Sequence, residues 1–424
     1  METNEIIQKI LRGTTEVINI ENLEKKIQSK KVLRIKAGFD PTAPDIHLGH
    51  VVLLRKLRHF QDLGHQVDFV IGDFTALIGD PSGRNQLRPR LEPVFIAENA
   101  KTYKNQALKI LKEEQTNFIE NSQWLGELTP ATLLSLTSRC TVAQMLARAD
   151  FKKRFEDNIE ISIMEFIYPL LQGFDSYALK SDIELGGADQ KFNLLMGRQI
   201  QEALVEDWKF TEIMNCILKN QVQDKLGTYM TRLCDVLLTD EFKAAQEPQV
   251  IIMMPLLEGT DGVQKMSKSS NNYIGISESS DEIFGKVMSI SDDLMMKYYE
   301  YLTDFDFKEI KELHPKEAKL KLAEEIVHQF HSNNHGLAAR NNFERTFSLR
   351  DIPEKIDQFD IKTSSTYLLL DVLIEARIVF SKNEARRLIK QGAISHDGIK
   401  INDENWLVQK GILKVGKRRF LRLI

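Results

Sequence analysis

The alternation of strand and helix patterns in the first third of the chain constrains its fold more than any other feature. Residues 31–36 (KVLRIK) form an apolar strand pattern that ends at Gly38, and residues 66–71 (QVDFVI) form a second one. Between them, residues 48–63 place apolar side chains at the spacing of an amphipathic helix. Two strands joined through a helix predict a parallel sheet covered by helices. Ligands bind beyond the carboxyl ends of such strands, so we expect the loop after Gly38 to belong to the functional site.

The rest of the pattern predicts an α/β fold: a Rossmann-like parallel-sheet catalytic domain over residues 1–290, followed by two smaller parts. Further helices are expected at 97–112, 163–174 and 190–202, and further strands at 118–119 and 250–254. Residues 291–350 are mostly helical in pattern, with a break at His314-Pro315. A linker at 351–362 then leads to a small α+β domain at 363–424.

Charge is divided unevenly along the 424 residues, whose net charge is −4. Residues 363–424 carry 12 Lys and Arg against 6 Asp and Glu, which gives this end a charge of +6 and the remainder −10. A small basic end on an acidic body favours a polyanionic partner such as RNA. A solvated charged face would have the same composition, so the charge alone leaves both interpretations open.

Cysteine usage and hydropathy indicate a soluble cytoplasmic protein with no membrane contact. Cys140, Cys216 and Cys234 are far apart and lack Cys-x-x-Cys spacing, which argues against a disulfide framework or a cysteine zinc site. No stretch reaches the roughly 18 uninterrupted apolar residues that a membrane span needs. The first residues also lack the basic and then apolar pattern of a secretory signal.

The loop from Gly38 to His50 combines features that suit a nucleotide. Because it follows a strand and opens a helix, its backbone N–H groups and the helix N-terminus favour an anion. His47 and His50 can donate to phosphate oxygens, and Gly49 lets a flat base approach the backbone. A metal site is one rival, but no glutamate follows in the arrangement of zinc proteases. Two ordinary surface histidines are the other.

A second loop, residues 258–272, contains the sequence KMSKS at 265–269. Lys265 and Lys268, with hydroxyls nearby, would supply mobile positive charges to a polyphosphate. Such a loop by itself is more often solvated surface, and the P-loop pattern is absent from the whole chain. The nucleotide site is therefore indicated by the two loops together, each of which follows a strand of one predicted sheet.

This pair of loops resembles the signature motifs of the class I aminoacyl-tRNA synthetases. Further segments resemble the bacterial tyrosyl-tRNA synthetases, in the same order along nearly the whole chain: GFDPT at 38–42, IGDPSG at 78–83, YPLLQGFD at 168–175 and GGADQ at 186–190. The resemblance implies a tyrosine–tRNA ligase, a homodimer that activates L-tyrosine with ATP and transfers it to tRNA(Tyr). Mg²⁺ is expected with ATP, although the sequence contains no dedicated metal site.

Matching positions inherit roles from this resemblance. The tyrosine-binding residues would be Asp80, Tyr168, Gln172, Asp175 and Gln190. Asp175 would accept the phenol hydroxyl, and Tyr168 and Gln172 share its helix face at i, i+4 and i+7 spacing. The ATP-binding residues would be Gly38, Asp40, Pro41, His47, Gly49, His50, Gly187, Asp189, Lys265 and Lys268. The catalytic residues expected around the phosphates are Thr42, His47, His50, Lys265 and Lys268.

Two regions depart from the family pattern. Better-known members carry a tyrosine, a second partner of the phenol, at the position that Lys36 occupies here. The segment between Lys191 and Gln264 is also longer than the family implies, which places an insertion near 204–244. Apolar positions in the insertion predict two amphipathic helices that pack together or on the body.

The C-terminal part resembles a small RNA-binding module shared with a ribosomal protein. Ser381 and Glu384 form a capping box at the start of a helix, and a hairpin turn is expected at Asp397-Gly398. The RNA-binding residues would be Arg386, Arg387, Lys390, Lys417, Arg418 and Arg419. The tryptophanyl enzyme, which shares the two nucleotide loops but usually not this module, is the alternative. An RNA-binding protein with a vestigial nucleotide site and a nucleotidyltransferase for another acceptor are the remaining ones.

Overall fold

The computed structural model describes residues 3–29, 31–82, 91–204, 247–345, 357–361, 367–379, 381–397, 399–416 and 419–424. They belong to two compact units, Met1–Ala339 and Arg340–Ile424. The predicted insertion near 204–244 lies outside the described residues except for its first one, and so do Lys417 and Arg418.

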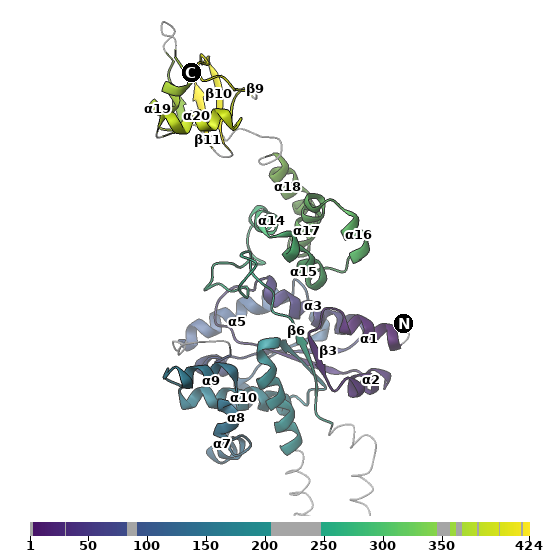
Figure 1. Cartoon of the computed structure of the whole chain (residues 1–424). Helices are drawn as coiled ribbons and strands as arrows, with labels where there is room; N and C mark the ends of the chain where they lie inside the picture. Colours follow the sequence, from purple (N-terminus) through teal and green to yellow (C-terminus); the bar gives the residue numbers. More distant parts are fainter. Residues whose placement is uncertain are drawn as a thin grey trace, which may run out of the picture. The chain divides into compact units, whose positions relative to one another are not determined.

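A six-stranded sheet forms the centre of the first unit, in the order β1-β6-β5-β2-β3-β4 (Figure 1). Its strands are β1 (Glu16–Ile18), β2 (Arg34–Phe39), β3 (Gln66–Ile71), β4 (Thr116–Glu120), β5 (Ile183–Gly187) and β6 (Val250–Met254). All neighbouring strands are parallel except β1, which pairs antiparallel with β6. The chain builds outward from β2 in one direction and from β5 in the other. The sheet therefore has its topological switch point between β2 and β5, where α/β folds bind ligands.

Helices cover both faces of this sheet, as the fold class predicts. In the view of Figure 1, α3 (Leu48–Asp62) and α10 (Ile163–Ala178) lie on opposite sides of the strands. The other helices described before β6 are α1 (Thr3–Leu11), α2 (Ile20–Gln28), α4 (Thr75–Ile78), α5 (Pro93–Ala107), α6 (Ser122–Leu125), α7 (Pro130–Thr137), α8 (Val142–Leu146), α9 (Ala149–Glu156) and one that begins at residue 191 and is described as far as residue 204. With strands buried on both faces, every residue of β6 is buried.

A helical part follows the sheet within the first unit. It contains α14 (Ser280–Ser289), α15 (Asp292–Leu302), α16 (Phe307–Glu312), α17 (Pro315–Phe330) and α18 (Asn333–Phe343), the last of which crosses into the second unit. The predicted break lies where α16 ends and α17 begins. Pro315 occupies the first turn of α17, where a missing N–H costs no hydrogen bond, and His314 caps it by accepting from the N–H of Lys316.

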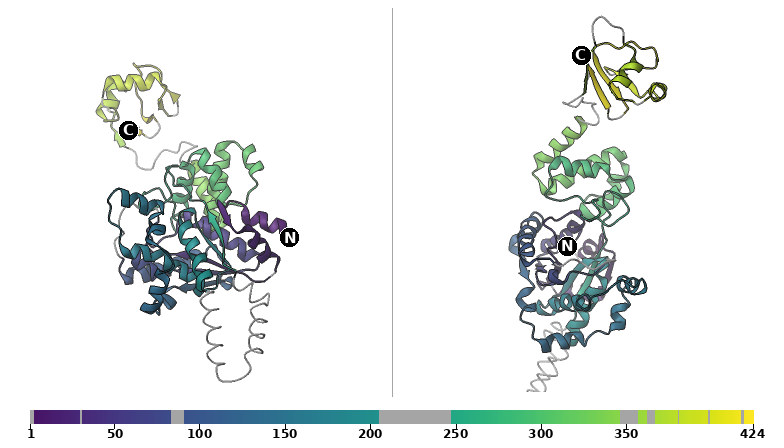
Figure 2. Two further views of the ribbon diagram at one scale, coloured as in Figure 1. Left: turned by 60° about the horizontal axis from the view of Figure 1, so that its bottom comes forward. Right: turned by 90° about the vertical axis from the view of Figure 1, so that its left-hand side faces the viewer.

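The second unit is a small α+β domain with its own core, whose strands Figure 2 shows in yellow. Its elements are β7 (Asp357–Phe359), α19 (Leu369–Glu375), α20 (Lys382–Lys390), β8 (Ile394–His396), β9 (Ile399–Lys400), β10 (Gly411–Val415) and β11 (Arg419–Leu423). The sheet order is β7-β11-β10-β8-β9. Leu373 of α19 and Ile389 of α20 pack with Leu413 and Leu421 of the sheet, so the two helices cover one apolar face.

Several boundaries differ from the sequence prediction; β4 and α10, for example, are longer than the predicted 118–119 and 163–174. The first strand runs over Arg34–Phe39, not 31–36, and contains Gly38, which pairs in register with Val70 of β3. The predicted helix 97–112 begins earlier, at Pro93, because a proline fits the first helical turn, and it ends at Ala107. The predicted linker 351–362 is wrong at residues 357–359, because β7 pairs there in parallel with β11. Among the described residues, no helix is long and apolar enough to span a membrane.

Candidate active site

The sequence-predicted site residues meet at the carboxyl ends of β2 and β5, on either side of the switch point. Gly38 lies in β2, Asp40 and Pro41 follow its last residue, and Asp189 lies in a 3₁₀ turn directly after β5. Asp40 accepts hydrogen bonds from the Tyr168 hydroxyl of α10 and from Thr75 Oγ1 of α4, both at 2.9 Å. Gly72 leaves the space for this carboxylate, because a Cβ there would lie 2.0 Å from Asp40 Oδ1.

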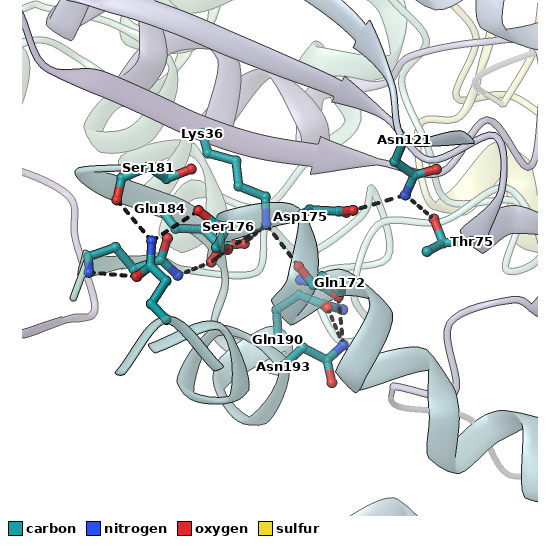
Figure 3. A network of polar contacts seen from close by, with 12 residues as sticks. Lys36, Thr75, Asn121, Gln172, Asp175, Ser176, Ser181, Glu184, Gln190 and Asn193 are labelled. Carbon is teal, nitrogen blue, oxygen red and sulfur yellow. Dashed lines mark hydrogen bonds and ion pairs between the residues drawn. The ribbon is translucent and has the colours of Figure 1, made fainter. Parts of the chain in front are cut away.

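One end of the predicted tyrosine pocket is a group of amide and carboxylate side chains, shown in part in Figure 3. Gln190 Nε2 donates to Asp80 Oδ2 at 2.7 Å. Asn193 Nδ2 donates to Gln172 Oε1 at 2.9 Å and to Gln190 Oε1 at 3.0 Å (Figure 3). Asp80, Gln172 and Gln190 are thus brought together as predicted, and Asn193 joins two of them. A carboxylate with oriented amide oxygens can bind an ammonium group.

The second group of predicted tyrosine-binding residues is built around Asp175, which is buried on α10. Trp124 Nε1 of α6 donates to Asp175 Oδ1 at 2.7 Å, and Asn121 Nδ2 donates to Asp175 Oδ2 at 3.2 Å. Burial raises the pKa of Asp175 to about 7, while the charge of Lys36 and the two donors oppose this shift. A carboxyl whose pKa lies near 7 and whose orientation is fixed can accept a hydrogen bond from a phenol in its ionised form.

Lys36 does not offer its ammonium group to the pocket as a free donor. Its side chain is fully buried, and Nζ donates to Glu184 Oε1 at 2.7 Å, Ser176 Oγ at 2.8 Å and the Gln172 carbonyl at 3.1 Å. All three N–H groups therefore have partners inside the protein (Figure 3).

The two histidines of the first loop stand at the start of α3. The backbone N–H of His47 donates to His50 Nδ1 at 3.3 Å, and the two rings are 4.0 Å apart. Burial, then the nearby His50 and lysines, lowers the pKa of His47 to about 2, and burial with Lys265 lowers that of His50 to about 4. Both imidazoles are therefore neutral at physiological pH. Since Nδ1 of His50 accepts, its Nε2 carries the proton and can donate to an anion.

The lysines of the second loop are paired with carboxylates that face them. Lys265 Nζ lies 2.6 Å from Asp189 Oδ2, and Lys268 Nζ lies 3.5 Å from Asp45 Oδ2. Both lysines remain partly exposed, so a bound polyphosphate can compete for them. Burial lowers the pKa of Lys268, while Asp45 opposes that shift. The ion pairs bring the second loop to the residues after β5 and before α3, as the predicted nucleotide site requires.

Asn272 holds the second loop in shape, a role that the sequence did not reveal. Its Nδ2 donates to Asp261 Oδ2 at 2.9 Å and to the carbonyls of Gln264 and Lys265 at 3.3 Å. Its Oδ1 accepts from the N–H of Ser267 at 2.8 Å. One buried amide therefore fixes the backbone on both sides of Lys265.

Comparisons with known proteins decide between the families that such a site allows. A family model described as tRNA synthetases class I (W and Y) matches residues 28–348, and one described as Tyrosine--tRNA ligase SYY-like C-terminal domain matches residues 348–421. The chain belongs to the class I tRNA synthetases of the tryptophan and tyrosine group. The residues matched by the first family model include both motif loops, which lie in the first unit of the structure.

Relatives of this synthetase match along its whole length. A protein of Aquifex aeolicus named Tyrosine--tRNA ligase is 46% identical over 100% of both chains. One of the same name from Desulfotalea psychrophila is 45% identical over 99% of this chain and 98% of its own. Among solved structures, a truncated mitochondrial tyrosyl-tRNA synthetase of Aspergillus nidulans has a TM-score of 0.61 at 22% identity, over 81% of this chain and 94% of that one. The tyrosyl-tRNA synthetase of Archaeoglobus fulgidus, complexed with L-tyrosine, has 0.56 at 20%, over 80% and 100%.

The synthetase's C-terminal unit carries the predicted RNA-binding residues on two elements. Arg386, Arg387 and Lys390 are exposed on α20, and Arg419 begins β11. Two of the arginines are engaged within the unit: Arg386 lies 3.1 Å from Glu404, and Arg419 lies 3.7 Å from Glu384. Such exposed pairs contribute little to stability, so a phosphate can displace the carboxylates.

Among the described residues, no group of three or more His, Cys, Asp or Glu side chains has the arrangement of a metal site. The carboxylates near the two loops, Asp45 and Asp189, already face lysines. This donor set fits a divalent cation carried by a polyphosphate better than one held by the protein alone.

Proposed function

We propose that the chain is a tyrosine–tRNA ligase in which the residues gathered around β2 and β5 perform both reaction steps. The observation that supports tyrosine as the substrate is Asp175, a carboxyl held by Trp124 and Asn121 at the buried end of the pocket. A site built to hydrogen-bond a substrate hydroxyl rejects an analogue that lacks it, because the buried polar group is then left without a partner. Full-length relatives named Tyrosine--tRNA ligase, at 45–46% identity, support tyrosine over tryptophan.

In the first step the carboxylate of tyrosine attacks the α-phosphate of ATP and releases pyrophosphate. Asp80, Tyr168 and Gln172 bind the ammonium group, so that the carboxylate is directed towards the nucleotide near Gln190. The hydroxyl of Tyr168 stays protonated, because burial and then Asp40 raise its pKa well above the usual range, and it donates to Asp40. No protein side chain needs to become a covalent nucleophile, since positioning and charge stabilisation suffice.

The nucleotide lies between the two loops in this proposal. Thr42, His47 and Lys265 face the triphosphate, and Lys268 stabilises the charge that develops on the departing pyrophosphate. Gly49 and His50 line the adenine side, and Asp189 with Gly187 meets the ribose. Mg²⁺ held by the phosphates of ATP would neutralise part of their charge.

In the second step a terminal ribose hydroxyl of tRNA(Tyr) attacks the carbonyl carbon of the adenylate, takes the tyrosyl group as an ester and releases AMP. The C-terminal unit binds this tRNA through its basic residues, in a sequence-tolerant and salt-sensitive way.

We also propose that the protein is a cytoplasmic homodimer. Large exposed apolar side chains gather in one stretch of the chain, namely Leu134, Val142, Phe155, Ile159 and Ile163, and a second copy would cover them.

The test is amino-acid-dependent exchange of labelled pyrophosphate into ATP, run with each of the twenty amino acids. Exchange with tyrosine alone, followed by charging of tRNA(Tyr), is the expected result. Exchange with tryptophan would establish the alternative specificity. No exchange with any amino acid, together with RNA binding, would instead identify an RNA-binding protein with a vestigial site.

A further inference from the structure

The buried ion pair between Lys36 and Glu184 lies directly behind the face of α10 that carries the proposed tyrosine ligands. The two residues are register partners on β2 and β5, on either side of the switch point. Their charged atoms are 2.7 Å apart, and the side chains are 0% and 1% exposed. Moving two charges out of water costs several kcal/mol each, and such a pair often stabilises a fold no better than apolar residues would. Its presence here calls for a reason other than stability.

The contacts of the pair fix one turn of α10. Lys36 Nζ donates to the carbonyl of Gln172 and to Ser176 Oγ, which lie four residues apart and enclose Asp175. Ser176 Oγ in turn donates to Glu184 Oε2 at 3.0 Å. The turn that carries Gln172 and Asp175 is thus attached to both central strands (Figure 3).

Close packing surrounds the pair and this turn of α10. The Nε2 of Gln249 donates to Glu184 Oε2, which gives the carboxylate a further partner. Behind it passes the helix that begins at residue 191, where a Cβ on Gly197 would lie 3.0 Å from Ser176 Oγ and 3.1 Å from Glu184 Oε2. A Cβ on Gly173 would lie 2.8 Å from Ile200 Cδ1, so α10 also packs closely against this helix.

We propose that the Lys36–Glu184 pair is a specificity-determining device that positions Gln172 and Asp175 around the bound tyrosine. Lys36 and Glu184 act through α10 and do not touch the substrate, so they are positioning residues. The inference rests on the proposed role of Asp175 as the group that reads the phenol.

The charges around Asp175 give this proposal a sign that can be measured. Burial raises the pKa of Asp175 to about 7; Lys36 is the strongest influence that lowers it, ahead of the donors Trp124 and Asn121, and Glu184 raises it less. The phenol of Tyr168, which stays neutral, is the other titratable group close to this carboxyl on α10. Removing both charges of the pair should therefore raise the pKa of Asp175, whereas removing only the negative charge of Glu184 should lower it.

Two variants separate these effects. Glu184→Gln retains an oxygen acceptor for Lys36 and removes the negative charge; its new NH2 group faces Ser176 Oγ and Gln249, whose amide must turn so that its oxygen accepts. Lys36→Met/Glu184→Gln removes both charges without leaving one unpaired. The matched control is Lys26→Met/Asp182→Asn, which removes a lysine–carboxylate pair of 2.9 Å just before β5 whose described side-chain hydrogen bonds go to each other and to the Arg34 N–H, not to α10. Tyrosine KM and kcat in pyrophosphate exchange are measured from pH 6 to pH 9, with phenylalanine as the competing substrate.

In the double variant Asp175 should lose its proton at a pH about one unit higher than in the parent. The tyrosine KM should therefore rise about fivefold at pH 7 and hardly change at pH 9. Glu184→Gln should move the profile the other way by a smaller amount and lower the KM about twofold at pH 6, with kcat little changed in both. The double variant should also lose part of the preference for tyrosine over phenylalanine. The control should match the parent at every pH.

Several results would overturn the inference. If both pocket variants shift the KM in the same direction, or by the same factor at all pH values, the pair acts only as structural support. An equal shift in the control would likewise make the effect general to the sheet. Asp175→Asn separates the two levels of the argument: unchanged preference for tyrosine in that variant would refute the role of Asp175 itself. Lost preference there, with parent-like profiles in the pair variants, would refute only the inference.

Discussion

Replacing Asn272 by alanine should disable the second loop while leaving the tyrosine pocket intact. The side chain is buried and makes two short hydrogen bonds: Oδ1 accepts from the N–H of Ser267 at 2.8 Å, and Nδ2 donates to the Asp261 carboxylate at 2.9 Å, while the second Nδ2 hydrogen is shared between two more distant carbonyls. The backbone on both sides of Lys265 depends on these bonds. Without them the loop samples conformations in which Lys265 and Lys268 no longer face the nucleotide.

The size of the effect follows from the two short bonds. A neutral hydrogen bond contributes about 1 kcal/mol and one to a charged group about 2 kcal/mol, so the ordered loop loses about 3 kcal/mol relative to its disordered forms. Since about 1.4 kcal/mol corresponds to a factor of ten, kcat/KM for ATP should fall by about a hundredfold. The two contacts at 3.3 Å are long and add little.

Pyrophosphate exchange at varied ATP and at varied tyrosine separates the two halves of the site, and binding of tyrosine alone serves as an independent check. We expect tyrosine affinity within about twofold of the parent, because none of the hydrogen bonds of Asn272 reaches the pocket. Gly259→Ala is the matched second variant, since its Cβ would lie 2.2 Å from Asn272 Cγ and push the amide out of place. Equal losses of tyrosine and ATP affinity, or less than about a threefold loss in either variant, would refute the reasoning.

Three further predictions concern other parts of the protein. Trp124→Phe removes the 2.7 Å hydrogen bond to Asp175 and should raise the pKa of that carboxyl above about 7. The tyrosine KM should therefore rise near pH 7 and return towards the parent value near pH 9, and a change that is the same at every pH would contradict this. Lys268→Ala should lower the rate of adenylate formation strongly with little effect on tyrosine binding, as single-turnover kinetics would reveal, and unchanged rates would remove this lysine from the mechanism. A chain that ends after residue 345 should retain pyrophosphate exchange but charge tRNA poorly, most visibly at higher salt, whereas loss of exchange in a folded truncation would contradict the separation of roles.

The truncation point shows what the sequence could and could not define. The predicted linker 351–362 would allow a cut anywhere before residue 363, but residues 357–359 form β7, an edge strand of the C-terminal sheet. A three-residue strand has too few residues for a periodic pattern, and its partner β11 lies some sixty residues later in the chain. In contrast, α3 and β3 were predicted nearly to the residue, because each carries its apolar pattern within a single short segment.

The proposed site divides in the same way. The motif residues of the two loops, and the face of α10 with Tyr168 and Asp175, could be identified from spacing and resemblance. The side chains that hold them could not, because each contact joins distant segments: Trp124 with Asp175, Lys36 with Glu184, and Asn193 with Gln172. Asparagine and tryptophan are common in many environments, so nothing in the local sequence distinguishes these from any others. These side chains are recognised only in the folded structure, where β2, β5 and α10 come together at one place.

Those contacts also explain why the pocket can act as a rigid template. Asp175 accepts from Asn121, Asn121 donates in addition to Thr75 Oγ1 at 3.1 Å, and Thr75 donates to Asp40. Asp40 accepts in turn from Tyr168, which lies on the same helix as Asp175, so the chain of hydrogen bonds closes on itself through α10. In a closed ring no side chain can rotate without breaking a bond of its neighbour, and each break in a buried site costs about 1–3 kcal/mol. A reaction whose catalyst supplies orientation more than chemistry depends on this property, because a carboxylate displaced by even 1 Å from the attacking position loses much of the advantage of being bound. The ring thus connects recognition of the phenol at Asp175 with the end of β2 that leads into the nucleotide loop.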